Sequence, residues 1–476
     1  MKKFKIFLEN FLVYGFGGII SKIIPFIMVP IVTRLMPRTE YFGISDLFNT
    51  VVSFGSAFAI IGMYDATYRL FFEKEDEQFK KSVCSTALVF TFFTSIIVFI
   101  VIVAGKKIIA QYFFGDRNYF YVVYLSAVAT LVGATNSIVS LPTRMQNKRK
   151  IFLITNTISP IISYAISIPL LLSGYYVIAL PVATIISGIS MELIFITMNR
   201  KWFVLKYFDW KILKQLFVIA IPLFPNFLIY WIFNSCDKVM ITNMLGVGDA
   251  GIYSVGAKLG SCSQLIYTAF AGGWQFFAFS TMKDENQVKV NSMIFEYLGI
   301  ISYTVTLFVC AWSYLIFRIF FTEQYINGYI VAPYLFLAPL LQMLFQVAGN
   351  QFLVVKKTWP NVLILSIGMI LNMIINYTLI PLLGIEGASI ATLIGYISSN
   401  IVCVVVLVRM DLMAISRRFL VVSFILALYI VLWRLMFVKN IFVGTVMAIL
   451  VMVMYLYIYK FDIFKLIHMI RRSDSS

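Results

Sequence analysis

The stretch NSCDKVMITNMLGVGDAGIYSVGAKLG, residues 234–260, carries charges between two segments that are almost wholly apolar. The charged side chains are Asp237, Lys238, Asp249 and Lys258. The flanking segments, IPLFPNFLIYWIF and SCSQLIYTAFAGGWQFFAF, have the composition of membrane-spanning helices. A charged side chain at the centre of a bilayer costs about 2.5–3.5 kcal/mol on insertion scales. These charges therefore indicate either a partner within the membrane or a function there.

The composition of the whole chain indicates a polytopic membrane protein. Of its 476 residues, 61% are hydrophobic and 12% are charged, whereas a soluble domain has about 25% charged residues. Apolar runs of roughly 20 residues, the length that crosses a bilayer, recur throughout. We predict an all-α fold of about fourteen such spans, at residues 11–33, 42–66, 82–104, 119–141, 151–172, 175–198, 215–241, 252–279, 290–316, 330–354, 360–381, 386–408, 417–437 and 440–459.

The distribution of Lys and Arg predicts that both termini are cytoplasmic. With the N-terminus inside, the inner loops hold more than three times as many Lys and Arg as the outer loops. The formal net charge of +17 then faces an anionic inner leaflet. We expect no nucleic-acid partner, because no soluble basic domain is predicted to carry one.

Two parts of the chain look like copies of each other. TRLMPRTEYFGIS contains Glu40 and Gly43, and TNMLGVGDAGIYS contains Asp249 and Gly251; each follows a span with paired prolines. Weak internal repeats of this kind are typical of transporters, whose sites lie between the repeats. We predict two pseudo-symmetric six-helix lobes followed by two additional helices: an N-lobe at 1–200, a linker at 201–214, a C-lobe at 215–410, and helices 13 and 14 with a cytoplasmic tail at 411–476.

The linker, which is rich in Trp, Phe and Lys, is too polar to cross the membrane. Phe203, Tyr207, Trp210 and Leu213 have a loosely helical spacing. The pattern predicts an amphipathic helix on the cytoplasmic surface.

Depth distinguishes the charges that lie within the predicted spans. Lys22 lies roughly 16 Å from either end of its span and Lys258 roughly 10 Å inside its own. The remaining charges that we consider lie nearer a boundary: Asp46, Asp65, Asp237 and Lys238. Two interpretations of the deep lysines stay open: an interhelical ion pair, for instance with Asp46 or Asp237, and a hydrated lumen that receives an anion. The glycines of GAKLG around Lys258 are compatible with close packing and with room for a head group.

Several residues resemble a known family. The pattern P-x-x-P-N…D-K-x-x-I, then G-x-x-x-x-G-x-Y and a lysine-bearing eighth span, is similar to the Wzx-type oligosaccharide-lipid flippases. These belong to the multidrug/oligosaccharidyl-lipid/polysaccharide (MOP) superfamily. The first span, with Lys22, and the predicted architecture also fit. The matching residues are Pro222, Pro225, Asn226, Asp237, Lys238, Ile241, Gly246, Gly251, Tyr253 and Lys258.

The resemblance implies export of undecaprenyl-pyrophosphate-linked oligosaccharide, for O-antigen, capsule or exopolysaccharide, across the bacterial inner membrane by alternating access. Lys22, Lys258 and Lys238 would contact the anionic head group. Asp46, Asp65 and Asp237 would couple transport to H+ or Na+, or pair with the lysines. A polysaccharide polymerase is a candidate partner. We expect neither a cofactor nor a metal, since the single histidine, His468, lies in the C-terminal tail.

Three other functions compete with this one. A cation-coupled antiporter of drugs or small molecules would need deep carboxylates where this chain has deep lysines. A lipid II flippase is less favoured, because its family carries arginines in the cavity. A membrane glycan polymerase would need a large outer loop with acid–base residues, and the longest outer loop here, GKKIIAQYFFGDRN, is short. We therefore expect a transporter and no enzyme.

Overall fold

The computed structural model describes residues 23–280, 286–355, 357 and 359–462. All regular structure within these ranges is helical, without a strand. Twelve of the described helices are long and apolar enough to cross a membrane. The first predicted span is described only as the helix Ile23–Leu35, and the eighth is divided into two shorter helices. The predicted class, an all-α polytopic membrane protein, is confirmed.

The described chain forms two compact units. One comprises the residues up to Val255 together with Leu365–Gly395, and the other comprises Gly256–Ile364 and the residues from Tyr396 onward. Three helices contribute one end to each unit: α11 (Val247–Gly260), α15 (Trp359–Leu383) and α16 (Ile385–Arg409). The units and the predicted lobes are different divisions of the chain, so the lobe boundaries stay predictions.

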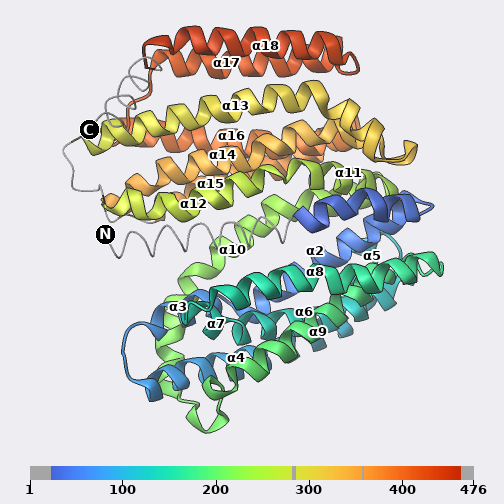
Figure 1. Cartoon of the computed structure of the whole chain (residues 1–476), viewed down its shortest axis with the longest axis vertical. Coiled ribbons are helices and arrows are strands. Elements are labelled where there is room, and N and C mark those ends of the chain that lie inside the picture. Colours follow the sequence, from blue (N-terminus) through green and yellow to red (C-terminus); the bar gives the residue numbers. More distant parts are fainter. Residues whose placement is uncertain (1–22, 281–285, 356, 358, 463–476) are drawn as a thin grey trace. The chain divides into compact units, whose positions relative to one another are not determined.

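The first unit is a bundle of long helices joined by short helical turns (Figure 1). Side-chain caps start two of its helices: Asp76 accepts a hydrogen bond from the Phe79 N–H at 2.8 Å, and Asp209 accepts one from the Lys211 N–H at 2.7 Å. Its elements are α2 (Thr39–Ile60), α3 (Met63–Phe71), α4 (Glu77–Ala104), α5 (Lys106–Phe114), η1 (Arg117–Tyr119), α6 (Phe120–Val139), α7 (Leu141–Met145), α8 (Arg149–Leu172), α9 (Ala179–Asn199), η2 (Arg200–Trp202), η3 (Leu205–Tyr207) and α10 (Trp210–Met244).

The second predicted span ends earlier than its hydropathy suggests. Ile61 and Gly62 both adopt the left-handed conformation, with φ of 47° and 73°, and this conformation stops α2. A Cβ on Gly62 would lie 2.6 Å from the carbonyl oxygen of Ala220, so α10 passes directly against the break. The break separates α3 from α2, a boundary that an unbroken apolar sequence does not reveal.

The predicted amphipathic helix in the linker is not present. The linker consists of the short 3₁₀ turns η2 and η3, and α10 has already begun at Trp210. The Ser85 hydroxyl of α4 accepts a hydrogen bond from the Val204 N–H at 2.9 Å and donates one to the Trp202 carbonyl at 3.2 Å. Because α4 satisfies these backbone groups and buries Trp202, the segment needs no helix of its own.

The second unit contains the two additional helices and the long helices beside them (Figure 1). Its elements, besides its shares of α11, α15 and α16, are α12 (Ser263–Ser280), α13 (Gln287–Phe320), η4 (Glu323–Tyr325), α14 (Gly328–Val354), α17 (Arg417–Leu432), the π-helical turn η5 (Trp433–Phe437) and α18 (Ile441–Ile458).

A buried carboxylate holds the two additional helices against α13. Glu296 accepts hydrogen bonds from the Ser416 N–H at 2.7 Å, the Ser416 hydroxyl at 2.8 Å and the Tyr459 hydroxyl at 2.9 Å. Ser416 caps α17, and Tyr459 follows α18 directly. Glu296 lies within the predicted span 290–316, and its hydrogen bonds join three helices.

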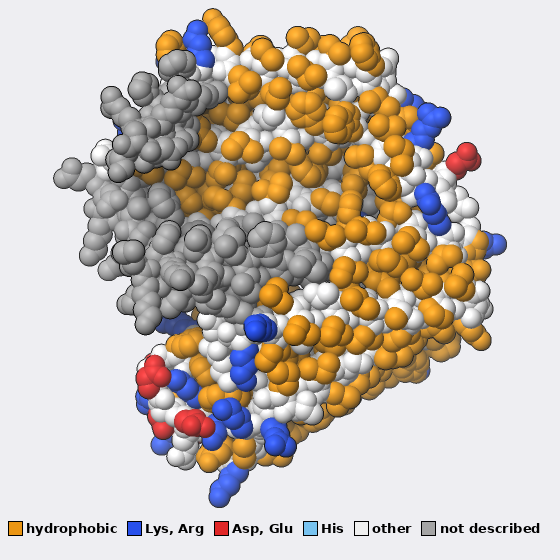
Figure 2. Space-filling view, in the orientation of Figure 1, with side chains coloured by type: hydrophobic (Ala, Val, Ile, Leu, Met, Phe, Trp, Pro, Cys, Tyr) orange, Lys and Arg blue, Asp and Glu red, His pale blue; other side chains and the backbone are white. Residues whose placement is uncertain are grey.

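The surface is that of a membrane protein. Apolar side chains cover much of the described surface in Figure 2, and the Lys and Arg gather mainly in its lower left part and along its right-hand edge. Phe442, Met436 and Leu435 of the additional helices are more than three-quarters exposed. Such exposure is expected where lipid, not water, contacts the protein.

Candidate functional site

The two copies of the repeated motif lie against each other in the first unit. A Cβ on Gly43 of α2 would lie 2.4 Å from the carbonyl oxygen of Val247, and one on Gly251 of α11 would lie 2.1 Å from that of Thr39. Both distances are far below van der Waals contact, so only glycine fits at either position. Thr39 and Val247 also begin α2 and α11. The repeat predicted from the sequence is therefore a close backbone contact in the structure.

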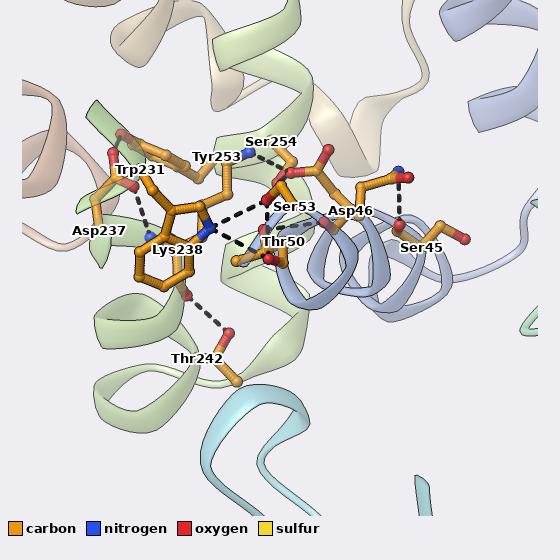
Figure 3. Close-up of polar contacts among 11 residues, drawn as sticks. Ser45, Asp46, Thr50, Ser53, Trp231, Asp237, Lys238, Thr242, Tyr253 and Ser254 are labelled. Atoms are coloured by element: carbon orange, nitrogen blue, oxygen red, sulfur yellow. Dashed lines mark hydrogen bonds and ion pairs between the residues drawn. The ribbon is translucent and has the colours of Figure 1, made fainter. Parts of the chain in front are cut away.

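An ion pair lies one turn farther along these helices. The Lys238 ammonium of α10 is 2.6 Å from Oδ2 of Asp46 of α2, and their side chains are 17% and 4% exposed. The Ser254 hydroxyl donates a hydrogen bond of 2.9 Å to the same oxygen, across a separation of 208 residues. This separation also relates Gly43 to Gly251. Figure 3 shows that Asp46 meets Lys238 and its own equivalent position in the repeat, Ser254.

A second buried carboxylate lies beside the pair. Asp237 is 4% exposed. Its Oδ1 accepts a hydrogen bond of 2.8 Å from the Lys238 N–H, and its Oδ2 accepts one from the Tyr253 hydroxyl. Oγ1 of Thr392 lies 3.5 Å from Oδ2. One lysine of α10 thus contributes its side chain to the ion pair and its backbone to the neighbouring carboxylate.

Two asparagines of α15 extend this polar group. Nδ2 of Asn372 donates to Oγ1 of Thr392 at 3.2 Å. Oδ1 of Asn372 and both amide atoms of Asn376 are buried without a hydrogen-bond partner among the described residues. An unsatisfied buried polar group is costly, and more so within a bilayer. The arrangement is therefore suited to a polar guest, such as water or an ion.

A tryptophan closes one side of the group. Nε1 of Trp231 of α10 donates to Oγ of Ser53 at 3.0 Å and to the Thr50 carbonyl at 3.3 Å (Figure 3). Its ring also packs against Phe54, with centroids 4.6 Å apart. These contacts keep α10 beside α2 at the level of the ion pair.

The structure brings together three of the six predicted site residues: Asp46, Asp237 and Lys238. Lys22 lies outside the described residues. Lys258 belongs to the second unit, where its side chain is exposed on the last turn of α11. α11 ends at Gly260, within the predicted span 252–279, and α12 continues from Ser263.

The sixth residue, Asp65, has other surroundings. It lies on α3, outside the twelve spans. Burial raises the pKa of the Asp65 carboxyl, and the Arg144 guanidinium opposes this shift. Arg144 itself donates a hydrogen bond to the Tyr64 hydroxyl. Asp65 thus belongs to a cluster with Arg144 and Tyr64, which is separate from the ion-pair group.

The sequence interpretation missed Ser254, Thr392, Asn372 and Asn376. The sequence contains a pattern that points to Ser254, because the 208-residue offset of the repeat makes it the position equivalent to Asp46. The spacing of Asn372 and Asn376 also points to a shared polar face, since residues four apart lie on the same side of a helix. Thr392 had none, because isolated threonines occur in many spans.

These features define a class. The chain is a multi-pass membrane protein with a paired and hydrogen-bonded charge cluster within its spans. Its fold is similar to that of the structure "Lipid II flippase MurJ, inward closed conformation", with a TM-score of 0.73 and 15% identity over 95% of this chain and 100% of that chain. An inward-facing multidrug resistance MATE family transporter of the MOP superfamily gives 0.58 and 14% identity, over 83% and 98%. An outward-facing one gives 0.60 and 12%, over 85% and 95%. The fold is therefore that of MOP-type transporters.

The family follows from the sequence itself. Residues 31–329, more than half of the chain, match the model of a family described as polysaccharide biosynthesis protein. The chain belongs to this family. No curated protein matches the sequence.

Proposed function

We propose that the protein is a flippase that exports undecaprenyl-pyrophosphate-linked oligosaccharide units, for O-antigen, capsule or exopolysaccharide, by alternating access. One observation carries this proposal: the chain belongs to a polysaccharide biosynthesis family and has the fold of a transporter. Its setting would be the bacterial cytoplasmic membrane with both termini inside, and a polysaccharide polymerase would consume the exported unit. The two predicted lobes would move against each other during transport.

The charges support an anionic substrate. A pyrophosphate needs cations in a site of low dielectric constant, and lysine provides a compact point charge for it. Lys22, Lys258 and Lys238 are the proposed contacts, and Lys238 would exchange its Asp46 partner for a phosphate oxygen. Export of each negative charge gains about 2.3 kcal/mol per 100 mV of inside-negative potential. The membrane potential thus favours export without ATP.

A deletion strain of the host tests the function. Without the gene, undecaprenyl-linked repeat units are expected to accumulate inside the cell while surface polymer is lost. A plasmid copy of the wild-type gene restores both. Unchanged surface polymer and no accumulation in the deletion strain would overturn the proposal.

Removal of the proposed phosphate contacts is expected to impair export. A hydrogen bond to a charged group contributes about 1.5–3 kcal/mol, which corresponds to a loss of roughly 10- to 150-fold. Lys22→Ala and Lys258→Ala should each lower the rate of polymer export by such a factor while the protein still inserts. Lys211→Ala, which changes a lysine at the start of α10, is the control and should export normally. Wild-type rates in both test variants would refute these contacts.

We also propose that Asp237 is the site through which H+ or Na+ drives transport. Its carboxylate, the Thr392 hydroxyl and the side-chain oxygen of Asn372, which has no hydrogen-bond partner in the described part of the chain, form an oxygen-rich group in the first unit. Hard cations prefer such oxygens, and a proton would neutralise the carboxylate. Asp46 is the less suitable candidate because it is already paired with Lys238.

The variant Asp237→Asn is expected to remove the ion dependence of transport. In proteoliposomes, wild-type flipping of lipid-linked units should accelerate with an imposed H+ or Na+ gradient, and the variant should show the same rate with and without it. Asp65→Asn, which changes a carboxylate of another cluster, should keep the response. An Asp237→Asn protein that still responds to the gradient would exclude Asp237 as the coupling site.

A further inference from the structure

A group of tyrosines at one end of the first unit is not used by the mechanism above. Tyr41 lies in the first turn of α2, Tyr119 ends η1, Tyr121 is the second residue of α6, and Tyr176 lies between α8 and α9. Three connections far apart in the sequence therefore supply these rings. We name the four residues the tyrosine rim.

The rings of the rim form two pairs. Tyr41 and Tyr176 are stacked, with centroids 5.1 Å apart and planes at 25°. Tyr119 and Tyr121 have centroids 6.2 Å apart, and the Phe114 ring lies 6.4 Å from that of Tyr119. Tyr121 is 38% exposed, and the other three tyrosines are half-buried. Each ring is thus held by a neighbour while part of it stays accessible.

Charged groups lie near Tyr119 of the rim. The Tyr119 hydroxyl interacts electrostatically with the carboxylates of Asp116 and Glu40, with the Arg38 guanidinium and with Tyr41. The Asp116 carboxylate also accepts a hydrogen bond from the Asn118 N–H at 2.9 Å. The rim therefore offers aromatic faces and charged hydrogen-bonding groups side by side.

This combination has a chemical consequence. The C–H face of a pyranose ring packs on an aromatic ring, and the hydroxyls at its edge bond to carboxylates and guanidinium groups. Tyrosine provides a large contact area at a small cost in conformational entropy. Interfacial belt tyrosines, by comparison, lie at the headgroup level of the bilayer. Here one stacked pair and one tilted pair of rings lie at the same end of the unit and form a more specific surface.

We propose that the tyrosine rim binds the sugar part of the exported unit on the outer face of the membrane. The proposal rests on the proposed function and adds a binding site to it. Tyr41 lies in the predicted outer loop 34–41, and Tyr119, Tyr121 and Tyr176 lie at the outer ends of the predicted spans 119–141 and 175–198. A sugar held there would keep the released unit from returning, while its lipid anchor stays in the outer leaflet.

The test replaces single rings in the full-length protein. Tyr41→Leu and Tyr176→Leu should each slow polymer export in the complemented deletion strain about two- to tenfold, the effect expected for loss of one aromatic contact. Tyr41→Phe and Tyr176→Phe keep the ring and should export at nearly the wild-type rate. Tyr457→Leu, which removes a 67% exposed tyrosine of α18, is the matched control.

A binding measurement decides the point without transport. The probe is the oligosaccharide released by mild acid from the lipid-linked fraction of the deletion strain. Saturation-transfer NMR with the nanodisc-embedded protein should show weaker binding for both leucine variants than for wild type. Should Tyr41→Leu unfold, Tyr121→Leu provides the same comparison.

Two results would contradict sugar binding by the tyrosine rim. One is normal binding and export by the leucine variants. The other is phenylalanine variants that are as defective as the leucine variants. Failure of the wild-type gene to restore polymer would overturn the proposed function and leave the binding result to decide the rim.

Discussion

Replacement of Lys238 by methionine is expected to abolish export and to lower the free energy of unfolding by about 3–5 kcal/mol, the usual cost of breaking a buried ion pair. Asp46 is 4% exposed and has the Lys238 ammonium 2.6 Å away. Without Lys238 its carboxylate loses the ammonium and keeps the hydrogen bond from Ser254. Thermal unfolding in detergent and polymer export in the complemented deletion strain are the measurements.

The double variant Asp46→Asn/Lys238→Met separates stability from function. Removing both charges leaves no unpaired ion, so most of the lost stability should return. Export should remain absent, because Lys238 is a proposed phosphate contact. A Lys238→Met protein as stable and as active as wild type would show that the pair has neither role. Recovery of export in the double variant would show that the pair is structural alone.

The second large effect is expected for Gly251→Ala. The new Cβ would lie 2.1 Å from the Thr39 carbonyl oxygen, and the nearby atoms are all backbone. α2 and α11 would have to separate, which should cost at least about 3 kcal/mol, the upper end of the range for overpacked sites. We expect little folded protein after extraction, measured as the monodisperse fraction in size-exclusion chromatography.

The control for this variant is another helical glycine of the first unit. A Cβ on Gly133 would meet only Oγ of Ser56, at 3.7 Å, so Gly133→Ala should fold normally and gain slightly in helix propensity. Gly43→Ala should fail like Gly251→Ala, since it would place its Cβ 2.4 Å from the Val247 carbonyl oxygen. Normal folding of both test variants would mean that the two helices are not in such close contact.

Hydropathy located most spans because each crosses the membrane as one apolar segment. It failed where tertiary contacts decide local structure. The break at Ile61 and Gly62 lies where α10 passes against the chain. The prediction of a helix in the linker was wrong because Ser85 of α4 forms hydrogen bonds with the linker backbone, which then needs no helical hydrogen bonds of its own. Neither contact has a local pattern in the sequence.

The candidate site was partly accessible from the sequence. Asp46, Asp237 and Lys238 stood out because charges are rare within spans. The sequence did not show which carboxylate pairs with Lys238, since Asp237 is its immediate neighbour and Asp46 is nearly 200 residues away. The structure assigns the ammonium to Asp46 and the backbone N–H to Asp237.

The sequence by itself determined the class of all-α membrane protein, the approximate spans and the presence of a repeat. Each segment that crosses the bilayer must be long and apolar whatever its neighbours are, so local composition identifies it. Only the tertiary structure decided which polar groups meet. Two repeats whose glycines allow backbone contact bring Asp46 to Ser254 and leave Lys238 beside it. Such pairings depend on distances between helices, which no single stretch of sequence contains.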